Sequence, residues 1–219
     1  MIQCKIKSFV LVMVVFTINS TCISQVEYLE KDQKAFLISL NGGSNGRTSA
    51  VSLSFGFSDE GYMSVNVIFG RNDLPPANIF GIYIDGNIVK AKKESSLGLS
   101  VFLSMVHLKF SPKFTPIPFF LKPGETSAYG TSASFGPKTY FYLIKKEKAA
   151  LVPFLQMAPI FSSFNSGGAS FKNTTTGLSA GLDLIVGSFR RNSVVISSGL
   201  TFIEGEKSYG LSIVWIDRK

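Results

Sequence analysis

The sequence predicts an all-β fold, a single antiparallel β-barrel that crosses a membrane with ten to twelve strands. Apolar and small polar residues alternate along much of the chain. Period-two alternation is typical of strands, because successive side chains leave opposite faces. The polar positions carry Ser, Gly, Asn and Thr in place of Lys, Glu or Arg, which favours an enclosed interior over a water-covered face. The alternating segments have about the 9 to 11 residues that cross a bilayer as a strand.

The C-terminal residues 173–219 show this alternation most clearly, as three consecutive strands. In 177–189 the apolar face consists of Leu178, Ala180, Leu182, Leu184 and Val186, opposite Gly177, Ser179, Gly181, Asp183 and Gly187. The pattern repeats in 193–202, after a turn at 190–192, and in 208–215, after a turn at Gly205 and Glu206. Each segment therefore has one continuous apolar face that a membrane could cover.

Further strands are predicted at 35–40, 49–58, 61–69, 79–84, 97–110, 114–121, 129–135, 139–144 and 150–163. Between them, 71–77 and 165–172 are expected to be loops, Gly136 and Pro137 a break, and Asp85 and Gly86 a type I′ hairpin turn, because Gly accepts positive φ. A change of phase inside 97–110 predicts a β-bulge near Met105. The count is eleven or twelve strands, or ten without one doubtful segment; an eight-stranded barrel with long loops is the alternative.

Residues 1–24 have the pattern of a secretory signal peptide. Lys5 and Lys7 precede a short apolar run, and Cys22 and Ser24 supply small residues before a predicted cleavage ahead of Gln25. Lipidation of Cys22 is the rival interpretation. The predicted organisation is thus a signal peptide at 1–24 and a barrel domain at 25–219. The domain would hold no cysteine, which excludes a disulfide framework, a thiol nucleophile and a Cys-ligated metal.

The chain is basic, with 22 Lys and Arg against 14 Asp and Glu. Export and the lack of a clustered basic helix argue against a nucleic-acid partner. A basic set in the connections could contact anionic lipid headgroups or lipopolysaccharide phosphates. It consists of Lys90, Lys92, Lys93, Lys145, Lys146, Arg190 and Arg191. Solvated turn charges are the plainer interpretation of the same residues.

The last strand carries a polar residue, then Gly, then bulky apolar residues at alternate positions: Ser208, Gly210, Ile213 and Trp215. In this the chain resembles the bacterial outer-membrane β-barrel family, and specifically its small barrels. The resemblance implies export to the outer membrane of a Gram-negative cell, porin-like transmembrane strands, and outer-membrane lipid and the barrel-insertion machinery as partners. It also implies that these four residues act as the membrane-insertion signal.

Aromatic residues near the predicted strand ends are expected to form girdles at the two membrane interfaces, where a ring meets both lipid and water. These interfacial aromatics are Tyr62, Phe69, Phe110, Tyr140, Tyr142, Phe189 and Trp215, with Phe161 as a further member.

His107 is the only histidine and the one weak catalytic candidate. A lipid-modifying enzyme would pair it with Ser104 or Ser111 and an acid such as Glu94. If Val106 and Leu108 face lipid, His107 faces the lumen or the rim. No motif joins these residues, so a structural histidine is the favoured interpretation, with no catalytic residue, cofactor or metal.

Three functions remain open at this point. The favoured one is a non-catalytic integral outer-membrane barrel, acting as a narrow channel, a structural component or a surface-loop scaffold. The alternatives are an outer-membrane lipid-modifying enzyme that uses His107 and a secreted soluble β-sandwich that binds surfaces or glycans.

Overall fold

The computed structural model describes residues 33–43, 48–57, 62–73, 76–110, 128–166, 169–189 and 191–219. Nearly all of these residues belong to strands. No helix in this part of the chain is long and apolar enough to cross a membrane. The predicted signal peptide at 1–24 and the predicted strand at 114–121 lie outside the described residues.

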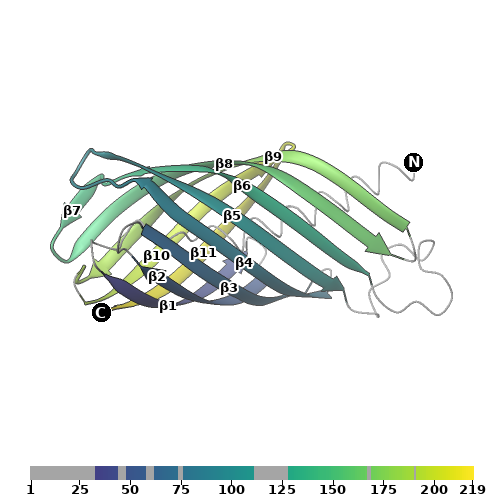
Figure 1. The fold of residues 1–219 in the computed structure, drawn as a ribbon, viewed down its shortest axis with the longest axis horizontal. Coiled ribbons are helices and arrows are strands. Elements are labelled where there is room, and N and C mark those ends of the chain that lie inside the picture. Colours follow the sequence, from purple (N-terminus) through teal and green to yellow (C-terminus); the bar gives the residue numbers. More distant parts are fainter. Residues whose placement is uncertain are drawn as a thin grey trace.

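Ten strands form one closed antiparallel ring (Figure 1). The strands are β1 (Lys34–Gly43), β2 (Thr48–Phe57), β3 (Tyr62–Asp73), β4 (Pro76–Val89), β5 (Leu97–Phe110), β6 (Tyr129–Phe141), β8 (Ala149–Ser166), β9 (Ala169–Gly187), β10 (Asn192–Ile203) and β11 (Glu206–Arg218). The short β7 (Ile144–Lys146) pairs with β8 beside the ring. Each ring strand pairs with its neighbour in sequence, and β6 pairs directly with β8. The predicted barrel of ten to twelve strands is confirmed, and both the eight-stranded alternative and the β-sandwich are wrong.

The first and last strands close the ring. Ile38 pairs with Trp215, and Ala35 pairs with Arg218. At the end of this ladder the Lys34 and Lys219 backbones exchange two hydrogen bonds of 3.1 and 2.8 Å. We call this end of the barrel the terminus end and the opposite one the far end. The connections β4–β5, β6–β8 and β9–β10 lie at the terminus end, because the strands run antiparallel in sequence order.

The two faces of the wall differ as the alternation predicts. Large apolar side chains are exposed on the outer face, for example Phe55, Leu103, Leu184 and Ile213. Buried polar residues point inward from every strand of the ring. They include Ser39, Asn41, Ser52, Ser54, Ser64, Asn66, Asp85, Ser100, Ser104, Ser132, Ser134, Gln156, Ser162, Ser179, Asp183, Ser197, Thr201, Ser208 and Ser212. Several pair across strands, as Ser39 does with Ser52 and Ser179 with Thr201.

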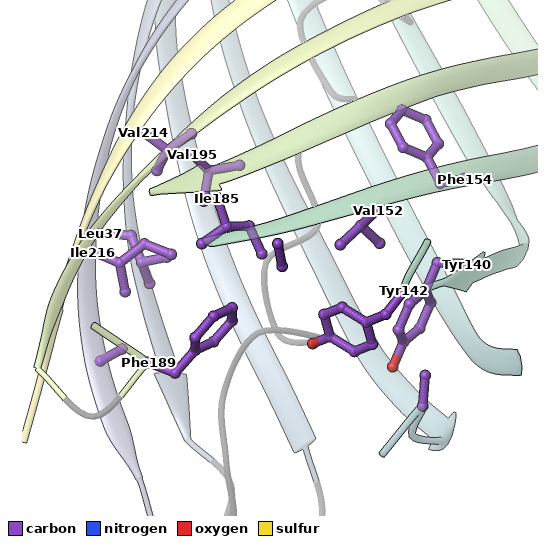
Figure 2. Packing of buried hydrophobic residues seen from close by; sticks show 13 residues of the cluster. Leu37, Tyr140, Tyr142, Val152, Phe154, Ile185, Phe189, Val195, Val214 and Ile216 are labelled. Atoms are coloured by element: carbon purple, nitrogen blue, oxygen red, sulfur yellow. The ribbon is translucent and has the colours of Figure 1, made fainter. Parts of the chain in front are cut away.

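Inward-facing apolar residues of the described strands form a cluster at each end of the barrel and a third between them, which consists of Ala50, Ile68, Tyr83, Phe102 and Ala158. The terminus-end cluster consists of Ala35, Leu37, Ala91, Tyr140, Tyr142, Ala150, Val152, Phe154, Ile185, Phe189, Val195, Val214 and Ile216 (Figure 2). The far-end cluster consists of Ala77, Ile79, Val106, Leu108, Phe110 and Phe164. The alternation predicts a lining of small polar residues throughout. The apolar clusters show that large side chains occupy part of the interior as well. Bulky inward side chains therefore lie near both mouths and also in the middle of the barrel, where the rings of Tyr83 and Phe102 stack with their centres 5.6 Å apart.

Two predicted irregularities are wrong. Asp85 and Gly86 form no turn, since both lie inside β4, where Ser64 pairs with Asp85 and donates a hydrogen bond to its carboxylate. The bulge near Met105 is absent, because β5 alternates without interruption. The register shift lies instead on β4, between Asn87 and Val89.

Two predicted breaks also continue as strand. Asn165 pairs with Ser170, so the expected loop at 165–172 mostly extends β8 and β9. The loop expected at 71–77 is likewise shorter, because β3 runs to Asp73 and β4 begins at Pro76. Gly136 and Pro137 lie inside β6, although the β6–β8 ladder is interrupted between the pairs Ser134–Ile160 and Lys138–Gln156.

Candidate functional site at the terminus end of the barrel

The structure does not bring the predicted catalytic residues together. His107 is exposed on the outer face of β5, where its Nδ1 lies 3.2 Å from the Thr131 Oγ1 and its ring lies 5.9 Å from that of Tyr129. Ser104 points to the opposite, inner face. Glu94 precedes β5, and the strand from Leu97 to His107 spans roughly 33 Å at about 3.3 Å per residue. Ser111 lies outside the described residues.

The orientation of His107 also differs from the conditional prediction. Val106 and Leu108 face inward, with 2% and 3% of their surface exposed, so His107 faces outward. In the described part of the chain, no group of three His, Cys, Asp or Glu residues could hold a metal ion. Of the two described candidates, neither Glu94 nor Ser104 lies within reach of His107.

The predicted interfacial aromatics divide into two groups. Phe69, Phe161 and Trp215 are exposed on the outer face, as a girdle requires. Phe110, Tyr140, Tyr142 and Phe189 are buried inside the barrel, so the girdle assignment is wrong for these four. They fill the two ends of the interior instead. The side chain of Tyr62 lies outside what the structure describes.

The four residues of the predicted insertion signal lie on β11, the strand that closes the ring. Ser208 and Gly210 face inward, and Ile213 and Trp215 face outward with 49% and 43% of their surface exposed. This is the alternation on which the resemblance rests. Recognition by an insertion machinery stays a prediction.

A basic cavity of about 680 Å³ opens at the terminus end. It lies between the β4–β5, β6–β8 and β9–β10 connections, and its lining consists of Lys92, Lys93, Glu94, Lys145, Lys146, Glu147, Ser188 and Phe189. Four members of the predicted basic set therefore meet in one place, although the two lysine pairs are separated by two strands in sequence. Four lysines against two glutamates leave the lining with an excess of positive charge.

The β4–β5 connection is fastened to the β6–β8 connection by backbone and side-chain bonds. The Ser95 N–H donates to the Tyr142 carbonyl at 2.9 Å. The Glu94 Oε1 accepts from the Lys145 N–H at 2.8 Å, and the Lys145 Nζ donates to the Lys92 carbonyl at 3.2 Å. These bonds fix the two lysine-bearing connections relative to each other.

Two aromatic rings lie near cations at the cavity, and one of them, Phe189, is part of its lining. The Lys145 Nζ lies 4.5 Å from the centre of the Tyr142 ring and 5.9 Å from that of Phe189. The Arg218 guanidinium lies 6.0 Å from the Phe189 ring. Such contacts are favourable because the negative face of the ring attracts the cation. Figure 2 shows Tyr142 and Phe189 at this end of the interior.

Residues from both ends of the chain hold the β9–β10 corner of the cavity. The Arg218 Nη1 donates to the Ser188 carbonyl at 3.1 Å and to the Ser193 Oγ at 2.8 Å. The Gln33 Nε2 donates to the Phe189 carbonyl at 3.1 Å. The corner is therefore fixed by β1 and β11, the two strands that close the barrel.

Inward-facing polar residues also form a row of cross-strand partners over six neighbouring strands. The cross-strand partners run Ser208, Thr201, Ser179, Gln156, Lys138 and Ser100. Lys138 is buried, and its Nζ lies 4.5 Å from the centre of the Phe154 ring. This row runs obliquely along the barrel, from Ser208 near the far-end start of β11 to Ser100 near the terminus-end start of β5.

Comparison with known proteins supports the fold but no specific function. No protein-family model and no curated protein matches the chain. Among solved structures, the translocator domain of the autotransporter NalP from Neisseria meningitidis has a TM-score of 0.50 at 10% identity, over 84% of this chain and 87% of that one. CdiB from Acinetobacter baumannii has a TM-score of 0.45 at 11% identity, over 78% of this chain and only 32% of its own.

The attachment invasion locus protein Ail of Yersinia pestis is also similar, with a TM-score of 0.43 at 11% identity, over 87% of this chain and all of its own. At such identities only the fold is comparable. The chain has the fold of an outer-membrane β-barrel.

Proposed function

We propose that this chain is a non-catalytic integral outer-membrane β-barrel whose interior is a narrow passage for small polar solutes. The observation that carries the proposal is the arrangement of the wall: ten strands close into a ring with apolar side chains outward and Ser, Thr, Asn and Gln inward. A closed barrel has no unpaired strand edge, which is the condition for crossing lipid with strands. The exposed outer Leu, Ile, Val and Phe side chains are suited to contact with acyl chains.

The size of the ring and of its lining supports a passage. Eight-stranded barrels are just wide enough for side chains to fill the interior, and width grows with strand number. Tyr83 of β4 and Phe102 of β5 fill part of the middle of the barrel, whereas most other strands carry serine at their middle inward positions. Such short side chains extend little toward the axis. The aromatic residues of the terminus-end cluster, among them Tyr140 and Phe154, would narrow the passage at that mouth.

The two membrane alternatives are weaker on the same geometry. A lipid-modifying enzyme would need an acid and a nucleophile beside His107; of the described candidates, Glu94 lies far from His107 and Ser104 points to the opposite face. A purely structural component or a loop scaffold would share the outer face but would not need a row of polar side chains across six strands of the interior.

The first test is cell fractionation followed by a denaturing gel of unboiled and boiled protein. We expect the protein in the outer-membrane fraction, with a band that shifts on heating because a closed barrel resists the detergent. The purified barrel is then inserted into a planar bilayer, where we expect small discrete conductance steps.

Ser197 and Ser198 provide a matched pair for the second test. Ser197 faces the interior and is 5% exposed, whereas Ser198 is exposed on the outer face. We expect S197Y to lower the conductance and S198Y to leave it unchanged. A heat-shifting barrel without conductance would contradict the passage and leave the membrane barrel standing, whereas soluble release would contradict both.

A further inference from the structure

We propose that the basic cavity at the terminus end binds a phosphate-bearing anion. The ligand class follows from the lining, in which the side chains of Lys92, Lys93, Lys145 and Lys146 surround one opening. Lysine ammonium groups bind phosphate as point charges through charge-assisted hydrogen bonds. The lysines themselves belong to the connections and not to the inner wall, whereas Phe189 belongs both to this lining and to the terminus-end cluster.

The frame around the lysines is built before any ligand arrives. Lys145 is held from both sides, because its N–H donates to Glu94 and its Nζ donates to the Lys92 carbonyl. Glu94 is thus engaged in fixing the frame, and its negative charge is partly offset there. Because the two connections are already held together, binding has to order the lysine side chains but not the backbone that carries them.

The shape of the cavity indicates more than a bare phosphate ion. A volume of about 680 Å³ is in the range of pockets for small organic molecules. The Phe189 side chain supplies an apolar part of the lining, and the Ser188 residue a polar part next to it. These features suit a molecule with a phosphate group and an organic body, either a soluble metabolite or the headgroup of a phospholipid.

The position of the cavity at the terminus end indicates which side of the membrane it faces, a step that rests on the proposed function. In outer-membrane barrels the longer connections are extracellular and the short turns periplasmic. The widest interval in sequence between neighbouring ring strands, from Phe110 of β5 to Tyr129 of β6, is at the far end. The cavity would therefore face the periplasm, away from the lipopolysaccharide leaflet suggested by the sequence analysis.

The test measures binding to the folded full-length barrel in neutral detergent micelles. Inorganic phosphate and glycerol 3-phosphate are titrated by calorimetry, and binding to phosphatidylcholine vesicles with and without phosphatidylglycerol is measured separately. We expect saturable binding of at least one probe. Binding of glycerol 3-phosphate would identify a soluble source, and binding of the phosphatidylglycerol vesicles alone would identify a lipid headgroup.

Two double variants with the same change in net charge assign the site. We expect K92Q/K146Q to bind about tenfold more weakly, as the loss of two charge-assisted contacts predicts. The control K172Q/K207Q changes two exposed lysines of β9 and β11 toward the far end and should bind like the parent. Unchanged affinity of K92Q/K146Q, an equal loss in the control, or no saturable binding of any probe would overturn the proposal. Conductance and the heat-dependent gel shift are recorded for each variant, so failure of the proposed function is seen separately.

Discussion

The aromatic ring of Tyr140 lies over Gly98, its cross-strand partner on β5. A Cβ atom added to Gly98 would lie 2.2 Å from the Tyr140 Cζ, far inside van der Waals contact. The same ring is fixed at its tip, where the Tyr140 hydroxyl donates to the Asn87 Oδ1 at 3.1 Å. Phe154 and Gly181 repeat the arrangement, with a distance of 2.4 Å to the ring. Glycine therefore makes room on the inner wall for the aromatic residues of the terminus-end cluster.

Gly98→Ala is expected to lower the free energy of unfolding by about 1–3 kcal/mol, because overpacking forces the ring or the strand to move. Urea titration of the refolded barrel in lipid vesicles measures the loss. Gly199→Ala is the control, since its Cβ would find its nearest neighbour at 3.5 Å, an ordinary contact. Combining Gly98→Ala with Tyr140→Ala should cost less than the two separate changes together. Additive losses would contradict the contact.

Gly136→Ala should destabilise the barrel more than Gly98→Ala does. Its Cβ would lie 2.1 Å from the Met157 carbonyl oxygen, a backbone atom that cannot swing away as a side chain can. We expect a smaller fraction of heat-shifting protein on an unboiled gel. In the double variant Gly136→Ala/Met157→Ala, that fraction should not recover. Recovery in that double variant would show that the Met157 side chain, and not the backbone, is the obstacle.

Leu103→Lys tests whether the outer face meets lipid. Leu103 is 46% exposed in the middle of β5, so water around the wall would make lysine harmless there. In a bilayer the charge should cost about 2–4 kcal/mol near the midplane and about 0–1 kcal/mol near the interface. Leu97→Lys, at the start of the same strand, is therefore the matched control. Equal stability of the two variants in vesicles would argue against a spanning orientation.

Arg218→Gln should loosen the β9–β10 corner. The substitution removes hydrogen bonds to the Ser188 carbonyl and the Ser193 Oγ, and unpaired buried groups cost about 1–3 kcal/mol. Lys219→Gln changes the net charge equally at an exposed neighbour and should be neutral. Hydrogen exchange of the amides at 187–193 measures the effect, which we expect to be faster exchange in Arg218→Gln alone.

His107→Ala should change stability by no more than about 0.5 kcal/mol, as is usual for exposed side chains away from special features. Lipid composition of the outer membrane in cells carrying the variant should also match the parent. A loss of acyl modification in that comparison would return the enzymatic alternative to consideration.

Strand direction and facing could be predicted wherever apolar and small polar residues alternate cleanly, as on β2, β9 and β11. The predicted turns failed for a physical reason. An enclosed polar interior favours Asp, Gly, Asn and Ser inside strands, and these residues also favour turns. Asp85 and Gly86 have the sequence of a hairpin turn, yet Asp85 is a lumen-facing strand residue bonded to Ser64.

The basic cavity could be predicted only in part. The sequence shows its lysines as a set in the connections. That they line one cavity depends on the pairing of β6 with β8 and on the hydrogen bond from the Ser95 N–H to the Tyr142 carbonyl. The inward aromatics were missed because a ring near a strand end is equally compatible with both faces. The glycine opposite Tyr140 was the available signal, and using it requires the strand register.

The closing ladder between β1 and β11 also governs the order of folding. Leu37 pairs with Ile216, so the first strand finds its second neighbour only after the last strand is present. Until then β1 keeps one edge of N–H and C=O groups without a strand, a state that is costly in lipid. Pairing partners this far apart in sequence make folding slow. The chain must therefore be kept from aggregating until its final residues arrive, and shortening β11 would leave the barrel open along its length.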